Sequence, residues 1–251
     1  SIQLNSEDNR ILNGHITSRF FFCFLTMILL YRFCRNFVSV KLSIISMFVF
    51  QAFLPLTTMY FGWETFIGTT FFLGGLICII EKRSLFLLLL ITLFGSTARA
   101  DHMVFISIIY FLFHFKSSMK KNQKVRIFLN STISFSIPVI SILIISLFLY
   151  PEANYVTDII QLNYNIKYIW SWIYPLIFLT LPIIFYKGIM NYDFFKKSWY
   201  WIIPFIIMNF SMAKTVEVRI FLPAIVYSMP FIMTELFSIL TKINIKSPTE
   251  R

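Results

Sequence analysis

Two groups of ionisable residues interrupt long apolar stretches, and their residue types suit anion binding and proton transfer. The first group is Arg99-Ala100-Asp101-His102, and the second is Lys214-Thr215-Val216-Glu217-Val218-Arg219. A charged side chain at the centre of a bilayer costs about 2.5–3.5 kcal/mol on insertion scales, so such residues mark functional positions. The chemistry of this chain is therefore expected at these two groups.

The cations of the two groups suit a phosphate or diphosphate. Arg99, Lys214 and Arg219 are the candidate substrate-binding cations, since guanidinium and ammonium groups bind phosphate oxygens. Two structural alternatives stay open. Arg99 can pair with Asp101 and lock helix packing, and Lys214 can pair with Glu217 at the i,i+3 spacing of a helix.

Three carboxylates are candidates for a catalytic base, namely Asp8, Glu64 and Asp101. The alternative for Asp8 is an ordinary surface loop ahead of the first apolar stretch. The alternative for Glu64 is a helix N-terminal residue favoured by the helix dipole. His102 and Glu217 are candidates for binding and orienting the substrate.

We predict no metal centre from this sequence. Asp101 and His102 are ligand types for a divalent cation, which leaves such a cofactor open, but two neighbouring ligands do not make a site. The three cysteines, Cys23, Cys34 and Cys78, show no metal or redox spacing.

The composition is that of a membrane protein. Hydrophobic residues make up 58% of the chain and charged residues 13%, against about 25% charged in soluble domains. The net charge of +11 does not indicate nucleic-acid binding, because the basic residues lie in short loops between apolar stretches rather than in one patch. Membrane lipids, and no nucleic acid, are the expected surroundings.

The apolar stretches predict an all-α fold, a polytopic transmembrane helix bundle of about nine spans that include short or broken helices. A helix needs about 20 apolar residues to cross the hydrocarbon layer. We expect one transmembrane domain over residues 1–251, with at least one further span preceding Ser1. The expected spans are 17–31, 42–58, 62–80, 85–97, 103–115, 127–149, 168–186, 199–213 and 220–241.

The basic residues also predict the orientation of the chain. Lysine and arginine gather in cytoplasmic loops. Of the 22 basic residues, all lie in alternate loops on one side except Arg10, Arg19, Arg99, Lys167, Lys214 and Arg219. The larger set is expected in the cytoplasm, and both ionisable groups are then expected at the outer side. A bacterial inner membrane is the expected location.

The first ionisable group is expected at the tip of a hairpin. Its arms, 85–97 and 103–115, are each only about 20 Å long at 1.5 Å per residue. Such arms do not reach the outer surface, so the tip is expected to be sunken in a protein-lined cavity. Gly95, Ser96 and Thr97 suit a helix break before the tip. Gly74-Gly75 indicates close helix packing, and Glu235 an interhelical hydrogen bond.

Two short segments resemble bacterial multi-span proteins of the GT-C glycosyltransferase type. The stretch Leu93-Phe94-Gly95-Ser96-Thr97-Ala98-Arg99-Ala100-Asp101-His102 is similar to a helix that ends in an Arg-x-acidic motif. The run Glu217-Val218-Arg219-Ile220-Phe221-Leu222-Pro223 is similar to an acidic-x-Arg-x-x-x-Pro segment of the same proteins. The resemblance implies a polyprenyl-phosphate sugar donor and a catalytic acidic residue in the first extracytoplasmic loop, which Glu7-Asp8 would match. The loop is short here, and we expect no long periplasmic domain after the last span.

The leading hypothesis is a transferase that acts at the outer face on a polyprenyl-linked sugar, either GT-C-like or a surface-polysaccharide polymerase. A transporter or lipid flippase with the same cationic cavity is the second hypothesis. A non-catalytic subunit of a membrane complex is the third. The donor sugar, the acceptor and the linkage do not follow from the sequence.

Overall fold

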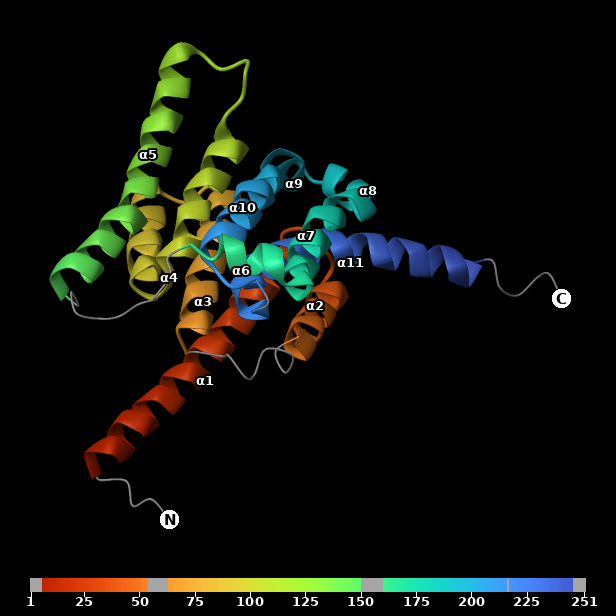
Figure 1. Ribbon diagram of the computed structural model, residues 1–251. Helices are drawn as coiled ribbons and strands as arrows, with labels where there is room; N and C mark the ends of the chain where they lie inside the picture. Colours follow the sequence, from red (N-terminus) through yellow and green to blue (C-terminus); the bar gives the residue numbers. More distant parts are fainter. Residues whose placement is uncertain (1–5, 54–62, 150–159, 216, 246–251) are drawn as a thin grey trace.

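The protein is a bundle of helices in the computed structural model, which describes residues 6–53, 63–149, 160–215 and 217–245 (Figure 1). Every regular element in these ranges is helical, which confirms the all-α class. The α-helices are α1 (Ser6–Arg35), α2 (Val40–Phe53), α3 (Trp63–Ile80), α4 (Leu85–His114), α5 (Lys121–Ile144), α6 (Leu162–Lys167), α7 (Ile173–Ile184), α8 (Tyr186–Met190), α9 (Asp193–Ser198), α10 (Ile202–Met212) and α11 (Leu222–Ile245). Shorter turns of 3-10 or π-helix are η2 (Ile145–Leu149), η3 (Ile169–Trp172), η4 (Trp199–Trp201) and η5 (Val218–Phe221).

Within the described residues, four helical stretches are long and apolar enough to cross a membrane, so the chain is a membrane protein. They are Ile16–Arg35, Leu85–His114, Lys121–Leu149 and Arg219–Leu240. Several expected spans are shorter in the structure. The stretch expected at 168–186 is divided into η3 and α7, and the one expected at 199–213 into η4 and α10. The number of nine spans stays a prediction.

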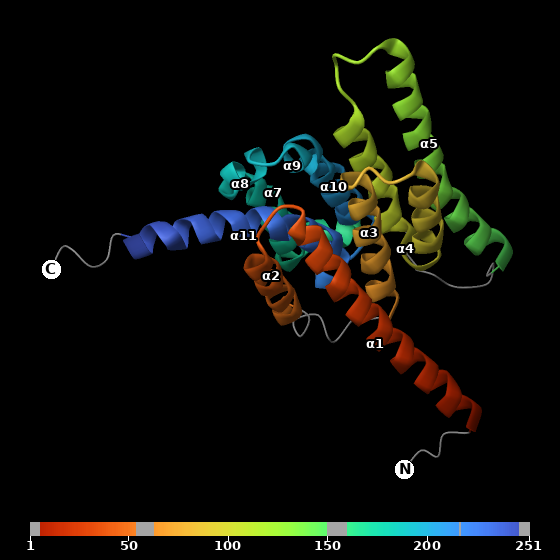
Figure 2. The same cartoon turned by 180° about the vertical axis from the view of Figure 1, so that it is seen from behind.

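Helix α4 folds back on itself at Arg99, as expected for a hairpin. Arg99 has φ −147° and ψ 77°, outside the helical region, and separates a first arm (85–98) from a second arm (100–114). A Cβ placed on Gly95 would lie 2.5 Å from Sδ of Met103. These two residues would be about 12 Å apart along a straight helix, so the arms lie side by side (Figures 1 and 2).

The helix break itself differs from the prediction. Gly95, Ser96 and Thr97 stay helical, and the interruption is confined to Arg99. Ser96 and Thr97 donate their hydroxyl hydrogens to Thr92 O and Phe94 O, within their own helix. The glycine at position 95 therefore serves close packing of the second arm rather than the turn.

Helix α3 packs against both arms through its glycines. Cβ atoms placed on Gly68 and Gly75 would lie 2.6 Å from Cγ of Arg99 and 2.9 Å from Cδ1 of Ile106. Both pairs are spaced by seven residues, so α3 and the second arm run parallel in close contact. The predicted role of the Gly74-Gly75 pair in helix packing is confirmed.

Gly68→Ala is expected to destabilise the protein, because its new methyl group would overlap Cβ and Cγ of Arg99 at 2.7 and 2.6 Å. Overpacking of this kind costs about 1–3 kcal/mol. Gly74→Ala is the matched control, since its Cβ would meet Ile91 at an ordinary 3.7 Å and alanine favours the helix by about 0.4–1 kcal/mol. Thermal unfolding in detergent should show a lower Tm for the first variant alone. Equal Tm values would contradict the close contact at Arg99.

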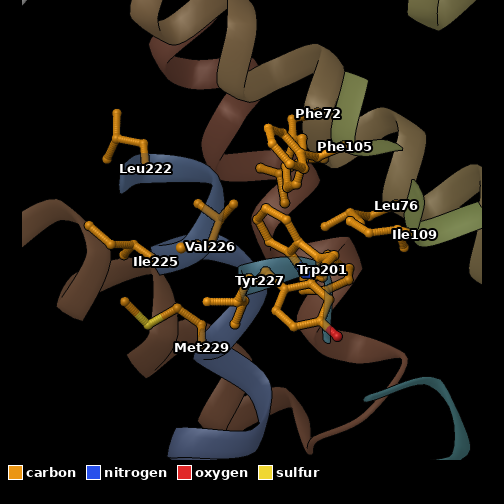
Figure 3. Close-up of a cluster of buried hydrophobic side chains, with 14 of the residues drawn as sticks. Phe72, Leu76, Phe105, Ile109, Trp201, Leu222, Ile225, Val226, Tyr227 and Met229 are labelled. Carbon is orange, nitrogen blue, oxygen red and sulfur yellow. The ribbon is translucent and has the colours of Figure 1, made fainter. Parts of the chain in front are cut away.

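Aromatic side chains form the centre of the bundle, where four elements meet. Trp201 is fully buried, and its ring centroid lies 5.6 Å from Phe72, 5.7 Å from Phe105 and 5.3 Å from Tyr227. Figure 3 shows this indole between the side chains of α3 and α4 and those of α11. The core therefore fixes the second arm of α4 against α10 and α11. In the last helix, the carboxylate of Glu235 accepts a hydrogen bond from Gly188 N at 2.9 Å, which confirms the interhelical bond predicted for it.

We call the end of the bundle with the α3–α4 turn (81–84) and the α4–α5 connection (115–120) the basic end, and the end with Arg99 the tip end (Figure 1). At the basic end, Glu81 accepts hydrogen bonds from Arg32 at 2.8 and 2.6 Å and from Arg83 at 3.0 and 2.8 Å. The hydrogen bonds from Arg32, and with smaller effect those from Arg83, lower the pKa of the Glu81 carboxyl.

This ion cluster predicts a pH-dependent stability. Because the pKa of Glu81 is lowered by folding, its contribution is present above the ordinary value of 4.5 and is lost as the pH falls through the lower value of the folded protein. Glu81→Gln should therefore lower Tm at neutral pH, and this effect should shrink as the pH falls through the lowered pKa of Glu81. Both arginines are half exposed, so the difference is expected to be small. A difference that grows in acid would contradict this assignment.

Candidate functional site at the tip end

The break in α4 positions an ion pair between Arg99 and Asp101. Arg99 donates from Nε to Oδ1 at 2.9 Å and from Nη2 to Oδ2 at 2.6 Å. Residues two apart do not face each other on a regular helix, so this pair depends on the non-helical backbone of Arg99. The Arg99 side chain is 16% exposed and that of Asp101 34%. The ion pair between Arg99 and Asp101 that the sequence left open is thus formed. Its two hydrogen bonds also fix the plane of the guanidinium group.

His102 is the most unusual member of the group, since it is fully buried and makes no hydrogen bond within the part of the chain that the structure describes. Its side chain has no exposed surface. Among the residues that the structure describes, neither ring nitrogen has a hydrogen-bond partner. Nε2 lies 3.7 Å from Oδ2 of Asp101, too far for a hydrogen bond. A buried polar group without a partner costs about 1–3 kcal/mol, so this histidine is retained at an energetic cost.

The second ionisable group forms a different ion pair from the one considered in the sequence. Arg219 donates from Nε to Oε2 of Glu217 at 2.8 Å. No Lys214–Glu217 pair is present among the described residues, because Ala213 is extended and a turn brings Glu217 N to Lys214 O, to which it donates at 3.1 Å. Nζ of Lys214 lies instead 5.4 Å from the centroid of the Tyr164 ring. That prediction is wrong because it assumed a helix.

Asn165 in α6 fixes the turn, and sequence reasoning missed it. Its side chain is fully buried and donates from Nδ2 to Phe210 O at 2.7 Å and to Ala213 O at 2.6 Å. Its Oδ1 accepts from Thr215 N at 3.2 Å and Thr215 Oγ1 at 3.1 Å. The position of Asn165 beside an apolar stretch could have indicated a buried polar side chain. Its hydrogen-bond partners lie 45–50 residues away in the chain, so the sequence alone does not identify them.

A chain of aromatic contacts joins the two groups. Phe105, one turn after His102, contacts Phe205 with ring centroids 5.1 Å apart, and Phe205 contacts Phe221 at 6.0 Å. Phe221 follows Arg219 by two residues. In Figures 1 and 2 the break in α4 and the segment between α10 and α11 lie toward the same end of the bundle. The packing thus holds both groups relative to one another through α10.

The other two predicted carboxylates belong to helices. Asp8 lies within α1, which begins at Ser6, so the loop expected around Asp8 is wrong. The helix extends further because residues 6–16 join the apolar stretch without a proline, and Gly14 is tolerated within it. Glu64 is the second residue of α3, in agreement with the helix-terminal alternative. The side chains of Asp8 and Glu64 lie outside the part that the structure describes.

An apolar groove of about 500 Å³ runs between α2, α7 and α11. Its walls include Ile45, Phe178, Ile225 and Ser228. The ring of Phe178 stacks on Phe221 with centroids 5.2 Å apart and an interplanar angle of 12°. The groove is thus next to η5, the element that carries Arg219.

Metal-ligating side chains do not gather at this site. Within the described ranges, no group of three histidine, cysteine, aspartate or glutamate residues could hold a metal ion. Asp101 and His102 remain two neighbouring ligand types. Comparison of the chain with protein-family models, with curated proteins and with solved structures finds no match.

Proposed function

We propose that this protein is a multi-pass membrane glycosyltransferase that acts at the extracytoplasmic face of a bacterial inner membrane on a polyprenyl-phosphate-linked sugar, in surface polysaccharide or glycan assembly. The basic end lies in the cytoplasm and the tip end outside, in keeping with the distribution of lysine and arginine. The observation that supports the proposal most is the buried His102, without a hydrogen-bond partner among the described residues, beside the Arg99–Asp101 pair.

In this proposal the two arginines bind the phosphate of the donor. Arg99 and Arg219 each have their guanidinium plane oriented by a carboxylate two residues away. An oriented guanidinium binds phosphate oxygens through parallel N–H bonds at a low entropic cost. Asp101 and Glu217 are positioning residues, and Lys214 adds a positive charge nearby.

His102 takes the proton in the transfer step, which requires the acceptor to reach a ring that has no exposed surface in this structure. The acceptor hydroxyl oxygen attacks the anomeric carbon of the sugar, and the bond from that carbon to the phosphate oxygen breaks. The hydroxyl proton moves to a ring nitrogen of His102, and the polyprenyl phosphate leaves with the bonding electrons. We prefer His102 to Asp101 as the base because the Asp101 carboxylate already accepts two hydrogen bonds from Arg99.

The apolar groove between α2, α7 and α11 suits the isoprenoid chain of the donor. Its volume of about 500 Å³ is within the usual 300–1,000 Å³ of ligand pockets. Its contact with η5 through Phe178 and Phe221 would carry the chain toward Arg219. A donor of this shape fits a site with a cationic end and an apolar side.

The test is release of polyprenyl phosphate by the purified chain in vesicles supplied with a panel of polyprenyl-phosphate sugars and an acceptor glycan. Arg219→Gln should reduce release about 10²-fold or more, the usual loss when a charge-stabilising donor is removed. Arg35→Gln, at the basic end, is the matched control and should retain wild-type release. No release by the wild-type chain with any donor, or equal release by Arg219→Gln, would reject the proposal.

A transporter for a lipid-linked anion is the second candidate, because α4 is broken at Arg99 and broken helices line the sites of many transporters. Cysteines at Ser96 and Ser211, in a chain whose three native cysteines are replaced, separate the two functions. Labelling of both positions from both sides of the membrane would favour transport. Labelling from outside alone would favour the transferase.

A further inference from the structure

A second polar pocket lies at the basic end, away from the site described above. Its volume is about 410 Å³, and it is formed by the α3–α4 turn, the end of α4 and the start of α5. Lys82, Arg83 and Arg126 line it, together with the polar side chains of Tyr110 and Asn130. The pocket therefore brings cations from two parts of the chain, 82–83 and 126, to one cavity.

The charge of this pocket is strongly positive. None of the described residues that line it is a carboxylate. Glu81 pairs with Arg83 from outside the lining, at 2.8 Å. Lys82 has a positive φ of 52°, a conformation that side-chain-bearing residues rarely adopt. The turn thus places a lysine at the pocket at some conformational cost, where glycine would be the usual residue.

The polar floor of the pocket offers hydrogen-bond donors as well. Asn130 donates from Nδ2 to the Tyr110 hydroxyl oxygen at 3.3 Å. Because this hydroxyl oxygen acts as an acceptor, its own hydrogen is left for another acceptor. Cations and neutral donors around one cavity are the groups that bind a phosphate.

We infer that this pocket binds a phosphate group at the basic end of the bundle. An anionic lipid is the favoured source over a soluble phosphate. Ser84 and His114 also line the pocket, and apolar side chains such as Leu85 and Leu88 form part of its wall. The neighbouring Phe86 is 70% exposed, as expected beside an acyl chain. Basic pockets between helices on the cytoplasmic side are known to bind lipid headgroups. The inference uses the proposed orientation of the chain and does not depend on the proposed activity.

The test uses the full chain in detergent with phosphatidylglycerol, phosphatidylcholine or inorganic phosphate as probes, followed by native mass spectrometry and by Tm. The double variant Lys82→Gln/Arg126→Gln should bind phosphatidylglycerol about thirtyfold more weakly, from the usual effect of two interfacial cations. The control Lys120→Gln/Lys121→Gln makes the same charge change outside the lining and should bind like the wild type. A Tm in phosphatidylcholine equal to that of the wild type shows that a variant is folded. If the double variant does not fold, the single variant Arg126→Gln takes its place, because Arg126 is exposed.

Three outcomes decide the inference. Selective loss of phosphatidylglycerol by the pocket variant supports a lipid site. A rise in Tm with inorganic phosphate but not with phosphatidylglycerol, abolished in the pocket variant, supports the phosphate site with a soluble source. Equal weakening in both double variants, or no preference of the wild type for any phosphate probe over phosphatidylcholine, would overturn it.

Discussion

His102→Leu is expected to give a protein that folds at least as well as the wild type and does not transfer sugar. Leucine fills a similar volume without polar atoms. Because neither ring nitrogen of His102 has a hydrogen-bond partner among the described residues, its removal relieves an unsatisfied polar group. Loss of a general base typically costs 10²- to 10⁴-fold in rate. Stability and transfer should therefore change in opposite directions.

The measurements are Tm in detergent and release of polyprenyl phosphate in vesicles. Thr92→Val is the matched control, since Thr92 is also buried in α4 but bonds to Leu88 O within its own helix. It should retain transfer. His102→Gln keeps hydrogen-bonding groups but does not take up a proton, so transfer by this variant would assign His102 to positioning. Full transfer by His102→Leu would remove His102 from the mechanism.

Asn165→Asp is expected to produce the largest loss of stability. A carboxylate accepts but does not donate, so the carbonyl groups of Phe210 and Ala213 would lose their partner and face a negative charge. Each buried group without a partner costs about 1–3 kcal/mol, which predicts a loss of about 2–6 kcal/mol in total. Since the same side chain fixes Thr215, the Glu217–Arg219 pair should also be displaced.

Asn163→Asp provides the control for this substitution. Asn163 lies in the same short helix, and its side chain is exposed, so the same chemical change should have little effect on Tm. Asn165→Asp should in addition weaken transfer even under conditions where the protein stays folded. An Asn165→Asp protein as stable as Asn163→Asp would show that the contacts of Asn165 do not hold the turn.

The break in α4 illustrates how far local sequence reasoning extends. Ionisable residues between two apolar arms predicted a hairpin with Arg99 near its tip, and the structure has that hairpin. The residues Gly95, Ser96 and Thr97 suggested a longer turn, which is wrong. Glycine is compatible both with a turn and with close helix contact, and the contact with Met103 that decides between them comes from the folded arms.

The second ionisable group shows the corresponding failure. The spacing of Lys214 and Glu217 suits a helix, but the Asn165 side chain forms hydrogen bonds with the backbone of Ala213 and Thr215 and stabilises a turn there. The charge partner of Glu217 then becomes Arg219. A tertiary hydrogen bond to a buried side chain thus overrides the local helix preference.

The sequence by itself determined the class of this protein, because apolar stretches and sparse charges reflect the cost of placing charge in a bilayer. The sequence also identified Arg99, Asp101 and His102 as ionisable residues within an otherwise apolar stretch. Tertiary structure decided which charges pair, that His102 is buried without a partner among the described residues, and that a cationic pocket forms between α4 and α5. The burial of His102 and the cationic pocket depend on side chains distant in the chain, which the packing of the helices brings together.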